Sequence, residues 1–348
     1  MKYSKAEGQT KVLNAGLELQ RTKLIARTWG NISARISDTQ FVITPSGRAY
    51  DTLSPEDIVT VNIKDGAYEG HIKPSIEKMI HAAAYRNRPE AGFVIHTHQN
   101  YGSAISTMER ELDLTHLHAD VSPADVDRLG GELVPCASYA FNGSQELADA
   151  LEEQMRIHPN AKAFFMQHHG VLCIGKDYEE AFAAAHALER ICEAEYRVLT
   201  GELFPDTNRP YQNFLSGSRT EDGRFVVISQ TPFVTKYSEL GKELLPFIDD
   251  YAQIIGLRAV SLPEHAGAAE ITDALKESNA ALVKGHGAIC VGRTSSDAEA
   301  AAIVLEKNCI AALLAEKCSD IHPLSEQHAA ADHEIYVNQY AKRITENR

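Results

Sequence analysis

Three histidines have the type and spacing of metal ligands. His96 and His98 are separated by one residue and follow the apolar run 92–95, which is typical of the end of a buried strand. Side chains two positions apart on a strand point to the same face, so both imidazoles can reach one ion. His169 follows a second apolar run, 163–166, and a strand laid beside the first would bring a third nitrogen to that ion.

Glu77, on a segment expected to be helical, completes the set. Three protein nitrogens with an open fourth position form the usual catalytic zinc arrangement, whereas closed structural sites use four ligands, often thiolates. Neutral imidazole suits zinc and, less strongly, cobalt, nickel or manganese. One histidine among fifteen is more often a surface or core residue, but the four residues together predict a metal centre. His168 stays open, because alternation along a strand would aim it away from His169.

Composition limits the class of protein. The 348 residues are enough for two domains or one large one, and 44% hydrophobic with 24% charged residues is ordinary for a globular protein. A formal net charge of −14 argues against a general binder of nucleic acid or of anionic membranes.

The first residues lack the apolar core of a signal peptide, and no stretch reaches about 18 apolar residues, so we expect a cytoplasmic location. The six cysteines lack Cys-x-x-Cys spacing and are expected to be small buried hydrophobes in a reducing compartment.

A repeat relates the two halves of the chain. Residues 167–199 align without a gap with residues 284–316, at the offset of 117 that separates His169 from His286. Each copy predicts a strand, a His-Gly pair, a second short strand and a long alanine-rich helix. No His-x-His pair follows residue 200, so the second copy is expected to have lost the chemistry. The other identities include Gly170 with Gly287, Cys173 with Cys290, Gly175 with Gly292, Glu189 with Glu306, and Cys192 with Cys309.

The boundary between the halves is expected near residues 202–220, where proline, glycine and polar residues cluster. This predicts a catalytic domain over 1–205 and a degenerate copy over 210–348. Upstream of the repeat the match is weaker, although Phe41-Val42-Ile43 is similar to residues 225–228.

Several motifs of the first half occur in one known family, in the same order and at similar spacing. On these motifs the first 200 residues resemble the class II, metal-dependent sugar aldolases, and the second half is similar to a degenerate copy. The family includes L-fuculose-phosphate aldolase, ribulose-phosphate 4-epimerase, methylthioribulose-phosphate dehydratase and the non-enzymatic adducin head. The motifs are Gly30-Asn31-Ile32-Ser33-Ala34-Arg35, Ile43-Thr44-Pro45-Ser46-Gly47, Lys73-Pro74-Ser75-Ile76-Glu77, His96-Thr97-His98 and Gln167-His168-His169-Gly170.

The resemblance implies an α/β fold: a three-layer α/β/α sandwich with a mostly antiparallel central sheet, here duplicated in tandem. It implies a homo-oligomer with the active site at a subunit interface, and a role in carbohydrate metabolism. It makes His96, His98 and His169 ligands of Zn²⁺, or of another divalent metal such as Mn²⁺ or Co²⁺. It makes Glu77 the catalytic acid and base, which also contacts the metal before substrate arrives.

The resemblance also implies how a substrate is held. In the phosphate-binding members, the residues that match Gly30, Asn31, Ser46, Gly47 and Ser75 hold the phosphate. The residues support this independently, because the Ser46-Gly47 turn has N–H groups that can cradle an anion, and Ser75 precedes a helix N-terminus. Alone, the turn would be interpreted as an ordinary turn, and Asn31 as a loop or capping residue.

Two positions depart from the family pattern. Many sugar-phosphate members have a second small hydroxyl residue where this chain has Ile76, which cannot donate to phosphate oxygens. The substrate is therefore either a phosphate held by fewer donors or a sugar with a carboxylate, a hydroxyl or a shorter chain. The aldolase tyrosine that donates a proton is not evident; His116 or His118 either replaces it or lies in a loop, and we prefer the loop.

We therefore expect a zinc-dependent aldehyde-lyase that cleaves a ketose or ketose phosphate by a retro-aldol reaction through an enediolate. The metal would act as a Lewis acid, and Glu77, with a raised pKa in a partly dry site, would exchange a proton with the reacting carbon or hydroxyl. The same chemistry serves an epimerase, a dehydratase or a decarboxylase acting on a sugar or sugar acid. A binding module like the adducin head is the alternative from another class.

Overall fold

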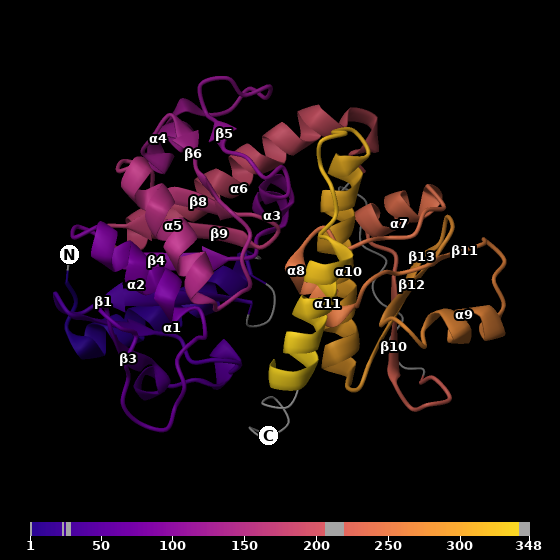
Figure 1. Ribbon diagram of the computed structural model, residues 1–348, viewed down its shortest axis with the longest axis horizontal. Coiled ribbons are helices and arrows are strands. Elements are labelled where there is room, and N and C mark those ends of the chain that lie inside the picture. Colours follow the sequence, from indigo (N-terminus) through magenta and orange to yellow (C-terminus); the bar gives the residue numbers. More distant parts are fainter. Residues whose placement is uncertain (1, 23, 26–28, 206–218, 341–348) are drawn as a thin grey trace. The chain divides into compact units, whose positions relative to one another are not determined.

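Helix α6 (Tyr178–Thr200) marks the point where the chain divides into two units. A computed structural model describes residues 2–22, 24–25, 29–205 and 219–340 (Figure 1). The first unit is Met1–Glu195 and the second is Tyr196–Arg348. Much of the predicted boundary, including the predicted start of the second domain at residue 210, lies outside the described residues, because 206–218 are not among them.

A seven-stranded sheet forms the centre of the first unit, in the order β3-β2-β1-β4-β9-β8-β7. Neighbouring strands run antiparallel except β7 and β8, which are parallel because helix α5 (Gln145–Ile157) lies between them in the chain. The sheet is therefore mixed, which corrects the prediction of a mostly antiparallel one. Its strands are β1 (Gly30–Arg35), β2 (Gln40–Ile43), β3 (Val59–Asn62), β4 (Phe93–Thr97), β7 (Cys136–Ala137), β8 (Ala163–Met166) and β9 (Gly170–Gly175).

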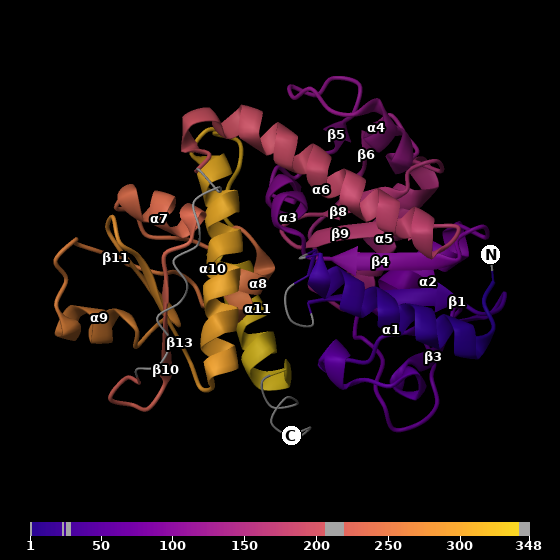
Figure 2. The ribbon, with the colours of Figure 1, turned by 180° about the vertical axis from the view of Figure 1, so that it is seen from behind.

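Helices cover both faces of this sheet and give α/β/α layers. Helices α2 (Lys78–Asn87) and α5 lie on the face that is in front in Figure 1, and α1 (Lys5–Arg21) and α6 lie on the other, in front in Figure 2. Val94 of β4 belongs to the core beneath α2 and α5, together with Ile80 and Leu151. His96 and His98 follow Val94 at intervals of two and therefore point to that same face. The shorter elements are α3 (Asn100–Ser106), β5 (Leu112–Asp113), α4 (Pro123–Leu129) and β6 (Leu133–Val134).

The second unit contains a four-stranded sheet in the order β10-β13-β12-β11. It is also mixed, because β11 and β12 are parallel and the other pairs are antiparallel. Its strands are β10 (Phe225–Ser229), β11 (Ser261–Leu262), β12 (Ala280–Val283) and β13 (Gly287–Gly292). Its helices are α7 (Pro232–Glu239), α8 (Asp249–Ile254), α9 (Ala268–Ala274), α10 (Ser295–Ala315) and α11 (Glu326–Ile335).

Several elements of the two units correspond. Strands β8 and β12, strands β9 and β13, and helices α6 and α10 start at positions separated by the offset of the repeat. Strand β10 takes the place of β4, because Phe225 pairs with Gly292 as Phe93 pairs with Gly175. The predicted similarity of β10 to residues 41–43 is therefore wrong, since those residues belong to β2, which pairs with β1 and β3. Over residues 219–340, no strand of the second sheet corresponds to β1, β2 or β3.

Two further sequence expectations concern the described residues. Cys173, Cys192, Cys290 and Cys309 are buried as expected, whereas Cys136 and Cys318 are only half-buried. Of the helices in the described part, none combines the length and the apolar character that a membrane crossing requires.

Candidate metal centre

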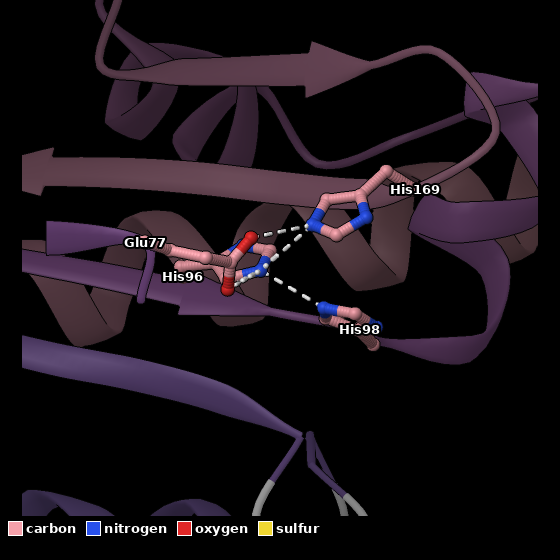
Figure 3. Close-up of side chains that lie close together, drawn as sticks. All are labelled: Glu77, His96, His98 and His169. Carbon is pink, nitrogen blue, oxygen red and sulfur yellow. Dashed lines mark hydrogen bonds and ion pairs between the residues drawn. The ribbon is translucent and has the colours of Figure 1, made fainter. Parts of the chain in front are cut away.

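The four predicted ligands meet at one end of the central sheet of the first unit (Figure 3). His96 lies in β4 and His98 directly follows it, while Glu77 immediately precedes α2. His169 lies in the turn between β8 and β9. The strand beside β4 is β9, which follows His169, and not β8, which precedes it. The prediction that the strand before His169 lies beside the strand of His96 is therefore wrong. The turn between β8 and β9 nevertheless brings the His169 imidazole to the site.

The distances among these side chains suit one small ion. The Nε2 atom of His96 is 2.9 Å from Nε2 of His98 and 3.2 Å from Nε2 of His169. Glu77 places Oε1 3.0 Å from Nε2 of His169 and Oε2 3.3 Å from Nε2 of His96. Ligands of a tetrahedral zinc ion, at bond lengths of about 2.0–2.1 Å, are roughly 3.3 Å apart. The donor atoms and their spacing therefore fit a divalent ion of this size.

A backbone contact fixes which nitrogen of His96 faces the site. His96 is fully buried, and its Nδ1 lies 2.9 Å from the carbonyl oxygen of Val171 in β9. A carbonyl can only accept, so Nδ1 carries the proton and Nε2 presents a lone pair to an ion. Gly170 permits this close approach of β4 and β9, because a Cβ at that position would lie 2.6 Å from the carbonyl oxygen of Thr97.

Glu77 is buried but ionised. Burial by itself would raise the pKa of its carboxyl, but the electrostatic attraction and hydrogen bonds of the His96 and His169 rings outweigh burial and hold that pKa well below its ordinary value. This direction is opposite to the expected raised pKa, because that expectation considered the dryness of the site and not the imidazoles around the acid. Glu77 is therefore a carboxylate that can bind a cation or accept a proton.

Asn31 and Ser75, two of the predicted substrate-binding residues, both contact Glu77. Asn31 Nδ2 donates to Glu77 Oε2 over 2.7 Å, and the backbone N–H of Glu77 donates to Ser75 Oγ over 3.2 Å. Both side chains are buried, Asn31 in β1 and Ser75 in the loop before α2. Asn31 is thus neither a loop residue nor a helix cap, but holds the acid.

The Ser46-Gly47 turn lies beside the segment that leads to Glu77. The backbone N–H of Ser46 donates to the carbonyl of Lys73 over 3.0 Å, and that of Ser75 donates to Thr44 over 3.0 Å. The expected anion cradle is therefore reduced by one donor, because the N–H of Ser46 is already bonded to protein.

Gly30 has a structural reason to be glycine. It has φ of +117°, and a Cβ there would lie 2.6 Å from the carbonyl oxygen of His96 on the neighbouring strand. A side chain would push β1 away from β4 and so move Asn31, the next residue, away from Glu77.

The residues that depart from the family pattern also have local explanations. Ile76 packs against a turn at Gly143, where a Cβ would come within 2.7 Å of its Cδ1 atom. His118 is mostly exposed, with Nδ1 2.5 Å from Oε1 of Glu195, and His116 lies 2.9 Å from Asp113. Both histidines are therefore in a surface loop, and Glu195 of α6 fastens that loop, as we preferred.

His168 points away from the metal ligands. It has φ of +58°, as Glu109 has φ of +56°, a conformation unusual for residues other than glycine. Nε2 of His168 is 2.8 Å from Oε1 of Glu109, and Gln167 Nε2 donates to the Glu109 carbonyl over 3.1 Å. These contacts hold the turn in the shape that aims His169 at the site.

The site predicted from the sequence did not include three polar residues behind Asn31. His81 and Tyr85 on α2 and Ser33 on β1 are buried and continue the hydrogen bonds that begin at Glu77. The sequence contained a signal for them, since polar residues alternate along β1 and recur every four residues along α2. These two sets are Asn31, Ser33 and Arg35, and Glu77, His81 and Tyr85.

Comparisons with known proteins identify related sequences and a related solved structure. Residues 10–196 and residues 218–313 each match the family model described as "Class II Aldolase and Adducin N-terminal domain". The chain is 32% identical over 182 residues to the L-fuculose phosphate aldolase of Escherichia coli K12, covering 52% of this chain and 79% of that protein. It is 30% identical over 184 residues to an L-ribulose-5-phosphate 4-epimerase of Salmonella paratyphi B, covering 52% of this chain and 80% of that protein. A solved L-fuculose 1-phosphate aldolase is 25% identical with a TM-score of 0.49, over 57% of this chain and 91% of that one.

Proposed function

Because the chain belongs to the class II aldolase and adducin family, we propose that it is a metal-dependent lyase that cleaves a ketose or ketose phosphate by a retro-aldol reaction. The observation that carries the proposal is the convergence of a buried carboxylate and three imidazoles, whose ligand atoms all lie within 4.8 Å of one another. A binding module similar to adducin does not require these four residues together. Their presence favours an enzyme.

We assign His96, His98 and His169 as the ligands of the ion, with Glu77 as a further contact. Nitrogen donors at tetrahedral spacing favour Zn²⁺ over Mn²⁺ and Co²⁺, which the same donors also accept. An ion bound here supplies Lewis-acid stabilisation of the negative charge that develops on the substrate's oxygens.

Glu77 is proposed to move the proton. As an ionised carboxylate it accepts a proton from the carbon or hydroxyl undergoing change, and the protonated acid returns it later in the cycle. Oε1 faces His169, while Asn31 holds Oε2. This contact leaves Oε1 directed into the site.

We propose that the polar end of the substrate is held by Gly30 and Asn31 of β1 and by the loop residues Ser46, Gly47 and Ser75. An asparagine amide has two N–H donors, so Asn31 can bond Glu77 with one and a substrate oxygen with the other. The bonded N–H of Ser46 and the apolar Ile76 both reduce the number of donors available to a phosphate. Unphosphorylated ketoses are therefore included among the candidate substrates.

We also infer that the second unit is a degenerate copy of the first, produced by tandem duplication, and that the protein is a homo-oligomer. Two separate matches to one family model support the duplication, as do the matching strand starts. Light scattering of the purified chain tests the assembly.

Metal analysis and a substrate panel test the proposed function. The purified chain is expected to hold about one divalent ion per chain and to release an aldehyde from one class of ketose or ketose phosphate. Glu77→Gln is expected to keep most of the metal and to lose about 100- to 10,000-fold in kcat. A wild-type protein without stoichiometric metal would favour a binding module. Near wild-type turnover by fully loaded Glu77→Gln would show that the acid and base assignment is wrong.

Epimerisation is the second candidate. It is favoured by the position of His116 and His118, which lie in a surface loop and leave no evident replacement there for the proton-donating tyrosine. The 30% identical epimerase shows that this family includes such a reaction. Proton NMR of the products separates the two, because an epimerase returns a ketose with the same number of carbons and an aldolase releases two fragments.

A further inference from the structure

A buried set of polar side chains connects β1 with α2 behind the metal centre. Asn31, Ser33 and Arg35 project from one face of the strand because they alternate along it, and Glu77, His81 and Tyr85 lie along one side of the helix segment because they recur every four residues. Two residues of a strand rise about 6.6 Å and four residues of a helix about 6 Å, so the two rows stay in step. We call these six residues the polar ladder. All six are at most 6% exposed.

The contacts of the polar ladder form one continuous line. Asn31 Nδ2 is 2.7 Å from Glu77 Oε2, and Asn31 Oδ1 is 2.5 Å from His81 Nε2. Ser33 Oγ is 2.7 Å from His81 Nδ1. Ser33 Oγ is also 2.8 Å from the hydroxyl of Tyr85. Each link joins the strand to the helix, so the line runs from the backbone of α2 near its end to the acid at its start.

Only one arrangement of protons satisfies every contact. The carboxylate of Glu77 can only accept, so Asn31 must turn its NH₂ group toward Glu77 and its oxygen toward His81. His81 must then donate from Nε2. Burial and the nearby His96 lower the pKa of His81 to about 3, so the ring is neutral and Nδ1 is an acceptor. Ser33 therefore donates to His81, and Tyr85 donates to Ser33.

Arg35 fixes the far end of the polar ladder. Its guanidinium lies 4.8 Å from the ring centroid of Tyr85, donates to the Tyr85 carbonyl, and donates from Nε to Ala91 over 2.8 Å. A third contact, to the Arg88 carbonyl over 3.2 Å, ties it to the residue that follows α2. The tyrosine ring is thus held with its hydroxyl beside Ser33 of the strand.

We propose that Ser33, His81 and Tyr85 are positioning residues, which act through the amide of Asn31 to hold Glu77 in its productive orientation. If the His81 ring carried its proton on Nδ1, Asn31 would have to flip and would present its oxygen to the carboxylate, which repels it. The tautomer of a histidine that does not reach the substrate therefore determines how the acid is held. This inference deepens the proposed function and rests on the proposed role of Glu77.

The first experiment observes the tautomer directly and does not depend on turnover. Long-range ¹H–¹⁵N correlation spectra of protein labelled on histidine nitrogen, with the His81→Gln variant used for assignment, are expected to show His81 neutral and protonated on Nε2 at pH 7. A ring protonated on Nδ1, or on both nitrogens, would overturn the proposal. This experiment remains informative even if no sugar in the panel is turned over, so its failure is distinct from failure of the proposed function.

The second experiment removes single hydroxyls. With saturating metal, Ser33→Ala is expected to lower kcat about 10- to 100-fold with KM changed less than twofold, and to weaken metal affinity about tenfold in a chelator competition. Ser33→Thr keeps the hydroxyl and is expected to restore most of both. Tyr85→Phe should have a smaller effect of the same kind, because Ser33 still donates to His81.

Tyr3→Phe is the matched control for Tyr85→Phe. Tyr3 is similarly buried, at 4% exposed, and its hydroxyl accepts from the backbone of Tyr178 at a distance of 3.1 Å, outside the polar ladder. It should leave kcat and metal affinity unchanged. A purely structural role predicts that both tyrosine variants lower stability alike and that Ser33→Ala changes KM and kcat together or neither. That result would contradict the proposal.

Discussion

In the first unit, β4 and β9 run antiparallel beside the turn that carries His169; in the second unit, β10 and β13 do the same beside His286. The strand pairing places Ile228 where the first unit has His96, and the next position after β10, Gln230, where it has His98. The amide of Gln230 donates to the His286 carbonyl over 3.2 Å. The side chain at the position of His98 is therefore hydrogen-bonded to the backbone in the second unit.

The close approach of the two strands is nevertheless kept in both units. A Cβ at Gly170 would lie 2.6 Å from the carbonyl of Thr97, and one at Gly287 would lie 2.2 Å from the carbonyl of Ser229. Thr97 and Ser229 occupy the same place in the pairing. The backbone framework thus depends on these glycines, whereas the chemistry depends on a few side chains that can change without loss of the framework.

The largest effect is expected from making the first unit like the second. His96→Ile, which introduces the residue found in β10, is expected to abolish stoichiometric metal binding and to lower kcat/KM about a thousandfold or more, because a ligand is lost and Lewis-acid catalysis with it. Elemental analysis and the aldehyde-release assay measure both. His286→Ala is the matched control and should leave about one ion per chain. If His96→Ile retained the metal, the presence of isoleucine at this position in the second unit would not explain a loss of metal binding there.

The next effect tests whether the framework is shared. Gly170→Ala and Gly287→Ala are each expected to cost about 2–4 kcal/mol in urea unfolding followed by circular dichroism, because each methyl meets a backbone oxygen. Only Gly170→Ala should also weaken metal binding. Gly131→Ala, whose Cβ would meet its neighbours at 3.5 Å or more, should change stability by less than about 0.5 kcal/mol. Tolerance of both alanines would mean that the strands do not need this approach.

A pH effect is expected from the polar ladder, for which residues 219–340 contain no corresponding strand. The folded pKa of His81 is lowered to about 3, so below about pH 6.5 the unfolded chain takes up a proton that the folded chain does not. The free energy of unfolding of metal-free protein should therefore fall as pH falls, with about 2 kcal/mol from His81 between pH 6.5 and pH 5. His81→Gln should remove that part of the slope, while His71→Gln, at an exposed position, should not. Identical slopes for wild type and His81→Gln would contradict a neutral buried ring.

The smallest effect concerns the turn before each His-Gly pair. His168 and Gly285 occupy matching positions with φ of +58° and +75°. His168→Gly should change the free energy of unfolding by less than about 1 kcal/mol, since a lost contact with Glu109 is offset by easier adoption of that backbone conformation. His168→Val and Gly285→Val should each lower the free energy of unfolding by about 1–2 kcal/mol more than His168→Gly does, because a β-branched residue resists positive φ. Urea unfolding measures all three, and equal effects of His168→Gly and His168→Val would show that the turn tolerates another shape.

Local spacing predicted part of the arrangement of the candidate site. His96 and His98 on one strand face, and Glu77 at a helix start, follow from periodicities that operate within a few residues. The neighbour of β4 could not be obtained in this way, because strand order depends on pairing between residues far apart. Two antiparallel strands follow one another around His169, and either could have lain beside β4.

The direction of the pKa shift of Glu77 and the role of Asn31 also could not be predicted from local spacing. Both depend on charges and donors brought in from other segments: His169 is 92 positions from Glu77, and Asn31 is 46 positions from it. The six-membered polar ladder was visible as two periodic rows in the sequence. Only the pairing of one row with the other shows that they form a single set.

The separation of the ligands also has a consequence for how the protein is made. The His96 ring bonds the backbone of β9, and His169 lies one turn before that strand, so no complete site exists until the β4–β9 pairing has formed. During synthesis this pairing cannot be completed until residue 175, the last residue of β9, has been added. A metal ion that needs all four residues would therefore bind late in folding, after this long-range strand pairing has formed.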